Sequence, residues 1–153
     1  MSTNSESHGS RDFVTFTIAD QLFGIRVLQV QDVLASHRIN PIPLAPDEIA
    51  GSLNLRGRIV TVINMRRRLG LEPRGKDEVD MSIVVEHGQE LYSLVVDSVG
   101  EVLPLSAEAY ESNPPTLEAH LRAYSAGIYR LEDQLLVVLD VDKLLDYGRT
   151  AAA

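Results

Sequence analysis

Cysteine is absent from this chain, which excludes a disulfide framework and any metal site built on thiolates. Long apolar runs are also absent, since no segment approaches the roughly 20 residues that a membrane helix needs. Residues 1–10 lack the apolar core of a secretory signal. These absences favour a cytoplasmic protein with no direct membrane insertion. We expect disordered tails at residues 1–11 and 149–153, because both have little apolar side chain to bury.

Sequence signatures of catalysis are missing as well. The chain has no glycine-rich phosphate loop, serine elbow or dinucleotide-binding fingerprint. Its histidines lack the spacing of metal ligands; they are His8, His37, His87 and His120. We therefore predict that the protein is not an enzyme and holds no cofactor or metal. The alternative is an active site without a known motif.

Two aspartates at the ends of apolar runs need a separate explanation. Asp97 and Asp140 both follow strand-like segments, and strand-end aspartates hold magnesium or accept phosphoryl groups in some α/β proteins. Those folds have long helices between parallel strands, which this sequence does not predict. Asp140 aligns with Asn64 in the internal repeat described below, and both residue types favour the N-cap of a helix. We interpret Asp140 as a capping residue.

Basic side chains are few and are concentrated in the first half of the chain. Residues 1–76 carry ten Arg and Lys against seven Asp and Glu, whereas residues 77–153 carry four against fifteen. Half of the fourteen basic residues lie between Arg56 and Lys76. Such a band could meet an acidic partner surface or remain a solvated face. Nucleic acid is not expected as a partner, because the acidic half would repel phosphates and no aromatic residues interleave the arginines.

Short strands separated by turns make up most of the sequence. Val14, Phe16 and Ile18 alternate with threonines, which is the periodicity of a strand. All seven prolines fall outside the strand-like runs. Short helical turns are expected at residues 64–69 and 142–145, and residues 117–121 are ambiguous. The further strand-like runs are Ile59–Ile63, Ser82–Val85, Leu91–Val96 and Leu135–Leu139. The pattern predicts an all-β fold.

The chain also contains an internal repeat. Leu22–Leu34 aligns without gaps to Leu91–Leu103, and Ile59–Leu69 aligns to Leu135–Leu145. Each repeat holds about five short strands without room for crossover helices, which favours two small barrels. We therefore predict one domain over residues 12–148, with lobe one at about 12–76 and lobe two at about 77–148.

Two surface features suit binding to another protein. Gly57 supplies the positive φ of a tight hairpin turn, from which Arg56 would project with a planar fork of donors for carboxylates or carbonyls. The segment Leu22–Leu34 holds more apolar side chains than one barrel face easily hides. The plainer alternatives are a solvated arginine and ordinary core packing.

Five segments in order resemble the CheW family, over about Asp12 to Tyr147. They are Phe23–Leu34, Ala45–Gly51, Asn54–Gly57, Val95–Leu103 and Leu135–Leu145, and the Asn-Leu-Arg-Gly run at 54–57 is the most specific. The resemblance implies two five-stranded SH3-like barrels. It also implies a scaffold that links the cytoplasmic tips of chemoreceptors to the histidine kinase CheA in membrane-associated receptor arrays.

Carried over by position, the resemblance places six residues at or beside the receptor groove: Val30, Asp32, Val33, Arg56, Gly57 and Val99. It leaves the residues of the kinase interface unassigned. The chain departs from the family's usual Asp-Leu-Arg at Asn64-Met65-Arg66, where Asn still caps but a salt bridge from that position is lost. The alternatives are a coupler of another receptor–kinase pathway, controlling pili or development, and an unrelated β-barrel binding module.

Overall fold

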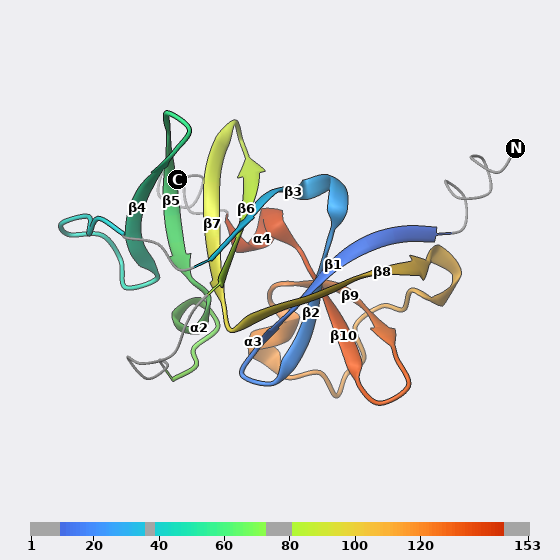
Figure 1. Cartoon of the computed structure of the whole chain (residues 1–153). Coiled ribbons are helices and arrows are strands. Elements are labelled where there is room, and N and C mark those ends of the chain that lie inside the picture. The colour runs from blue at the N-terminus through green and yellow to red at the C-terminus, as the bar shows by residue number, and fades with distance from the viewer. Residues whose placement is uncertain (1–9, 36–38, 73–80, 146–153) are drawn as a thin grey trace, which may run out of the picture.

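Ten strands of the described residues form two five-stranded sheets, which lie side by side in Figure 1. The computed structural model describes residues 10–35, 39–72 and 81–145. Sheet A has the order β8 (Ser98–Ser106), β1 (Ser10–Ile18), β2 (Gln21–Arg26), β10 (Leu135–Leu139), β9 (Ser125–Arg130). Sheet B has the order β3 (Val30–Leu34), β6 (Met81–His87), β7 (Glu90–Val96), β5 (Arg58–Asn64), β4 (Ile49–Leu55). The predicted all-β fold class is confirmed.

The start of β1 corrects one predicted boundary. β1 begins at Ser10 and pairs Arg11 with Leu105 of β8, so the last two residues of the tail predicted at 1–11 belong to a strand. Ladder hydrogen bonds with a neighbouring strand order these residues although their own composition is polar. Residues 1–9 and the tail predicted at 149–153 lie outside the described residues.

The order of the strands shows how the two repeats combine. If each strand of sheet A is replaced by the strand five places away in the chain, the order becomes that of sheet B. The first repeat is therefore β1–β5 and the second is β6–β10. Each sheet contains two strands of one repeat and three of the other.

The lobes consequently do not follow the predicted division at residues 76 and 77. β1 and β2 join sheet A, and the chain then crosses at the 3₁₀ turn η1 (Val27–Gln29) to β3 of sheet B. The second repeat makes the reverse crossing at Asp97, between β7 and β8. Because of these two crossings, the first two strands of each repeat lie in the same sheet as the last three strands of the other repeat. The repeats therefore exchange strands.

Pairing registers agree with the aligned sequence repeat. In the two hairpins, Thr17 pairs with Leu22 and Glu86 pairs with Leu91. The parallel pairs likewise join Leu136 to Leu22 and Val60 to Leu91. Both hairpin turns have two consecutive residues of positive φ, at Ala19–Asp20 and at Gly88–Gln89, as two-residue turns between strands require.

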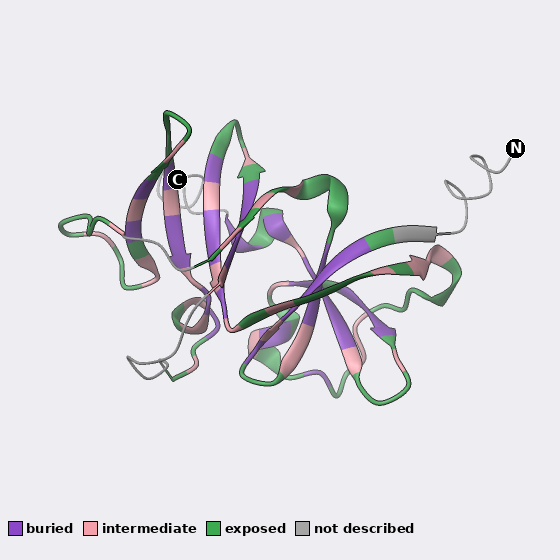
Figure 2. Ribbon diagram, in the orientation of Figure 1, coloured by how far each residue is buried: buried purple, intermediate pink, exposed green. Residues whose placement is uncertain are grey.

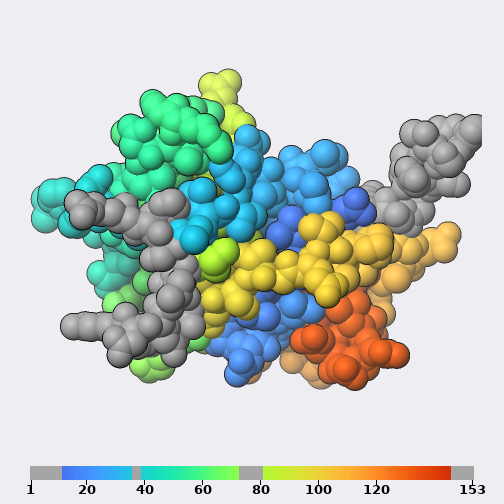
Figure 3. Space-filling view, in the orientation of Figure 1, coloured from blue at the N-terminus to red at the C-terminus, as the bar shows by residue number. Residues whose placement is uncertain are grey.

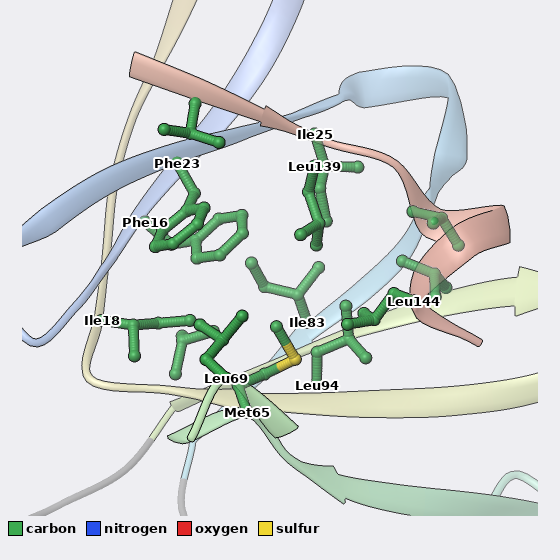
Figure 4. Packing of buried hydrophobic residues seen from close by; sticks show 14 of the residues in the cluster. Phe16, Ile18, Phe23, Ile25, Met65, Leu69, Ile83, Leu94, Leu139 and Leu144 are labelled. Carbon is green, nitrogen blue, oxygen red and sulfur yellow. The ribbon is translucent and has the colours of Figure 1, made fainter. Parts of the chain in front are cut away.

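Buried side chains form a central cluster between the sheets and a smaller cluster on each sheet. Figure 4 shows the central cluster, in which the Phe16 and Phe23 rings stack with centroids 5.5 Å apart. Met65 and Leu144 enter it from α2 and α4. In Figure 2 the buried positions follow the inner strands, whereas β8 and the turns are largely exposed. The two sheets therefore share one core.

The described helices are single turns, and two of them, α2 and α4, begin at a side-chain cap. The helices are α2 (Met65–Arg68), α3 (Ala119–Arg122) and α4 (Val141–Leu144), and a second 3₁₀ turn is η2 (Ala107–Ala109). Asn64 accepts a hydrogen bond from the Arg67 amide, and Asp140 accepts one from the Lys143 amide. These bonds satisfy amides that the first turn leaves unpaired, and they confirm the predicted capping role of Asp140.

Candidate partner-binding site at the edges of the two sheets

The hairpin between β4 and β5 positions Arg56. Arg56 and Gly57 both have positive φ, 52° and 86°, which is the geometry of a two-residue turn with the right-handed twist of its strands. The Asn54 side chain accepts a hydrogen bond from the Gly57 amide at 3.0 Å. The Asn54 side chain therefore stabilises the turn, and the Arg56 side chain projects from it with 75% of its surface exposed.

Arg56 pairs with Asp32 of β3. Arg56 Nη2 lies 2.9 Å from Asp32 Oδ2, while Asp32 Oδ1 accepts a hydrogen bond from the Val33 amide. β3 is one edge strand of sheet B, and the Arg56 hairpin begins in β4, the other edge strand. The ion pair thus joins the two edge strands of sheet B and keeps the exposed guanidinium close to β3.

The three predicted valines lie on the edge strands β3 and β8. Val30 and Val99 are counterparts in the repeat, and both are partly buried against the central cluster. Val33 and its counterpart Val102 are exposed, at 39% and 53%. Figure 3 shows β3 (pale blue) and β8 (yellow) on one face of the molecule. Each of these two edge strands thus has one exposed valine at an equivalent position.

Some of the apolar side chains in Leu22–Leu34 pack in the core, and others are exposed on the surface. Phe23 and Ile25 are buried in the core, as ordinary packing predicts. Val27 and Leu28 of η1 are exposed at 37% and 84%, and Val33 is exposed as well. The exposed part lies where the chain leaves sheet A and enters sheet B, so the crossing creates an exposed apolar strip.

Two of the five described arginines of the basic band, Arg66 and Arg68, are half-buried and turned toward the protein itself. Arg66 holds both carboxylate oxygens of Asp97, at 3.0 and 2.6 Å. Arg68 donates to the Leu144 carbonyl and lies over the Tyr124 ring, 4.9 Å from its centroid. These contacts stabilise the junction of the two sheets. Arg66 also makes an ion pair next to the position where Asn64 departs from the family pattern.

Titratable side chains elsewhere have structural contacts. His87 Nδ1 lies 3.1 Å from Asp142 Oδ1, at the junction of β6 and α4. Within the described ranges, no three His, Asp or Glu side chains gather as a metal site would require. No described helix is long and apolar enough to span a bilayer.

The structure brings together some of the six predicted residues and adds two others. Asp32 and Arg56 are in contact, Gly57 forms the turn beside them, and Val30 and Val99 pack on the same core. Sequence reasoning missed Asn54, although an Asn three residues before a turn glycine is a known signal for side-chain support of the turn. It also missed Val102, which is the counterpart of Val33 in the repeat alignment.

Comparisons with known proteins identify the family of the chain. The model of the CheW-like domain family matches residues 12–149. Chemotaxis protein CheW of Klebsiella aerogenes is 33% identical over 88% of this chain and 81% of its own length. That of Treponema pallidum is 27% identical over 94% of this chain and 85% of its own length.

A solved structure agrees as well. The scaffolding protein TtCheW of Thermoanaerobacter tengcongensis superimposes with a TM-score of 0.76 at 33% identity, covering 84% of this chain and 88% of that one. This chain belongs to the CheW-like domain family.

Proposed function

We propose that the protein is a non-catalytic chemotaxis adaptor that couples chemoreceptor tips to a CheA-type histidine kinase and is recruited to receptor arrays. Its family membership and its likeness to a scaffolding protein support this proposal. The relatives reported above are chemotaxis proteins, which favours this pathway over one that controls pili or development. The observation that carries the proposal is the Asp32–Arg56 pair beside an exposed apolar strip.

The receptor site consists of an apolar trough and one oriented charge. A receptor tip is a helical hairpin, so its docking site needs apolar contacts along the helix and a polar contact that sets the register. Val30, Val33 and Val99 supply the first, and Arg56 supplies the second. Because Asp32 engages one nitrogen of Arg56, the guanidinium is oriented while its other donors remain available to carboxylates or carbonyls of the receptor.

Replacing Arg56 by alanine tests this site. A hydrogen-bonded charge lost from an interface costs about 2–5 kcal/mol, which is about thirty-fold or more in affinity. The free energy of unfolding should fall by about 1 kcal/mol or less, because the lost ion pair is largely exposed. We expect Arg56→Ala to keep its melting temperature within a few degrees, to lose binding to a receptor-tip fragment and to keep binding to the kinase.

Arg67→Ala is the matched control, since Arg67 is exposed in the same basic band but lies on α2. Both affinities and the melting curve are measured for each variant. Equal receptor binding by the two variants would show that Arg56 is an ordinary surface arginine. A pulldown from cell extract, probed for a chemoreceptor and a CheA-type kinase, tests the pathway itself.

A further inference from the structure

A groove on sheet B lies outside the proposed receptor site. Its cavity of about 390 Å³ lies between the start of β5 and the β6–β7 turn. Ile59 lies in it with 67% of its surface exposed. Its lining residues are Arg58, Ile59, Thr61, Gln89, Glu90 and Leu91. An exposed isoleucine in a concave site calls for an explanation, because the other large side chains of β5 are buried or pack inward.

The repeat shows what covers the same position in sheet A. Ile59 corresponds to Leu135, and Thr61 corresponds to Val137. Val137 is fully buried in the central cluster, and Leu135 packs against that cluster. Leu117 and Leu121, both 7% exposed, belong to the same cluster. They come from the α3 segment, which therefore provides apolar cover on this side of sheet A.

A second cavity confirms where α3 lies. It is lined by Asp20 and Gln21 of the β1–β2 turn and by Glu118 and Leu121 of the α3 segment. In the repeat, Asp20 and Gln21 correspond to Gln89 and Glu90, which line the groove on sheet B. The two cavities therefore adjoin equivalent turns of the repeat, and α3 borders the one at the β1–β2 turn.

The first repeat has no counterpart of α3 among its described residues. Equivalent bridges, Asn40 with Ser52 and Glu111 with Ile128, mark the same point in both repeats. Between Glu111 and β9 the chain forms α3, whereas the shorter stretch from Asn40 to β4 contains only turns. Leu44 of this stretch is fully exposed, at 103%, and so covers no apolar surface.

The polar rim of the groove also differs from its counterpart. Gln21 Nε2 donates to the carbonyls of Leu22 and Leu135, so its side chain lies over the β2–β10 pair. Glu90 has no such donors, and its carboxylate accepts a hydrogen bond from the Tyr92 hydroxyl at 3.3 Å. Burial and the Glu90 charge raise the pKa of Tyr92, so the phenol stays neutral and donates to the carboxylate.

We propose that this groove binds a short amphipathic helix of a partner protein. The helix would place aliphatic side chains against Ile59 and Thr61, as the α3 segment places Leu117 and Leu121 on the central cluster. A basic residue beside them would face the exposed Glu90 carboxylate. The groove is the site that the second repeat covers with its own chain and the first repeat leaves for a partner.

The α3 segment itself supplies the probe. A synthetic peptide of residues 113–124 is titrated into the full ¹⁵N-labelled protein, and backbone amide shifts are mapped by NMR. We expect concentration-dependent shifts at residues 58–61 and 88–91. Ile59→Glu should weaken peptide binding at least tenfold, and a peptide with Leu117→Ala and Leu121→Ala should not bind. Glu90→Gln should weaken binding several-fold at low salt.

Leu44→Glu is the matched control, because it adds the same charge at a more exposed leucine away from the groove. Shifts confined to Ile18 and Phe23 would mean that the peptide displaces α3, and the proposal would be wrong. It would also be wrong if Ile59→Glu and Leu44→Glu bound the peptide alike. If Ile59→Glu abolished a concentration-dependent association of the protein alone, measured by sedimentation, the occupant would be a second copy of this chain.

Discussion

At the scale of single residues, the turn that carries Arg56 depends on backbone conformations that most side chains avoid. Arg56 itself adopts a left-handed conformation, with φ of 52°, which costs a non-glycine residue about 1 kcal/mol. The Asn54 side chain and the Asp32 ion pair offset this cost from two directions. The position of the guanidinium therefore depends on residues that do not themselves touch a partner.

Two glycines near this hairpin should respond differently to alanine. At Gly57 an added Cβ would meet no atom within 4 Å, so only the φ of +86° opposes it, and we expect a loss of about 1 kcal/mol in the free energy of unfolding. At Gly51 the Cβ would lie 2.4 Å from the Asn40 carbonyl oxygen, and we expect a loss above about 2 kcal/mol. Urea denaturation measures both; equal losses would contradict the steric argument.

At the scale of elements, ion pairs of similar geometry differ in burial and hence in their contribution to the free energy of unfolding. Arg66 and Asp97 expose only 20% and 16% of their side chains, and they tie α2 to the crossing between β7 and β8. The Asp97 carboxylate also accepts a hydrogen bond from the Ala19 amide at 2.8 Å, in the β1–β2 turn. One carboxylate thus connects three elements.

Asp97→Ala should therefore destabilise the protein by about 3 kcal/mol or more, because it removes one carboxylate from both Arg66 and the Ala19 amide in a poorly solvated site. Glu111→Ala removes the partner of Arg130, where the side chains are 44% and 59% exposed, and should cost about 1 kcal/mol or less. Chemical denaturation of both variants provides the comparison. Equal losses in the free energy of unfolding would mean that burial does not determine how much each ion pair contributes to stability.

Substitutions of Asp140, the N-cap of α4, distinguish a structural role of this residue from a catalytic one. Asp140→Asn keeps an oxygen that can accept the Lys143 amide, so stability should stay within about 0.5 kcal/mol, whereas Asp140→Ala should cost about 1 kcal/mol. We expect no nucleotide hydrolysis, no labelling by acetyl phosphate and no tightly bound metal in the parent protein. Stoichiometric metal in the purified protein that Asp140→Asn removes would overturn the adaptor assignment.

At the scale of the whole molecule, the repeats are interlocked. Each sheet is completed by strands of the other repeat, and both repeats contribute to the central cluster. Neither half of the chain can therefore form a complete sheet or close its own core. The crossings at η1 and Asp97 make the two lobes one folding unit.

Separate fragments of residues 1–76 and 77–153 should each be unfolded, and mixing them should restore structure. The intact chain should unfold in one transition, because local loss of either sheet exposes the shared core. Circular dichroism and NMR of each fragment and of the mixture test this expectation. A well-dispersed NMR spectrum from either fragment alone would show that the repeats fold independently.

Several features could be predicted from the sequence because they are local or repeated along the chain. The strand-like runs, the hairpin turn at His87–Glu90 and the cap at Asp140 follow from side-chain pattern and turn chemistry. The duplication was visible because both copies keep the same apolar spacing. Arg56 was predicted from its turn as well as from the family resemblance, and Asp32 from the resemblance alone; neither argument predicts the contact between them.

The exchange of strands, the Asp32–Arg56 pair and the open groove at Ile59 were decided only by the tertiary structure. A repeat in sequence records similarity between segments, and either copy of a strand could pair within its own repeat or with the other. The side on which η1 and Asp97 direct the chain selects between these arrangements. Composition and spacing determined the all-β class and the repeat, whereas long-range pairing, which no local pattern encodes, determined which side chains meet.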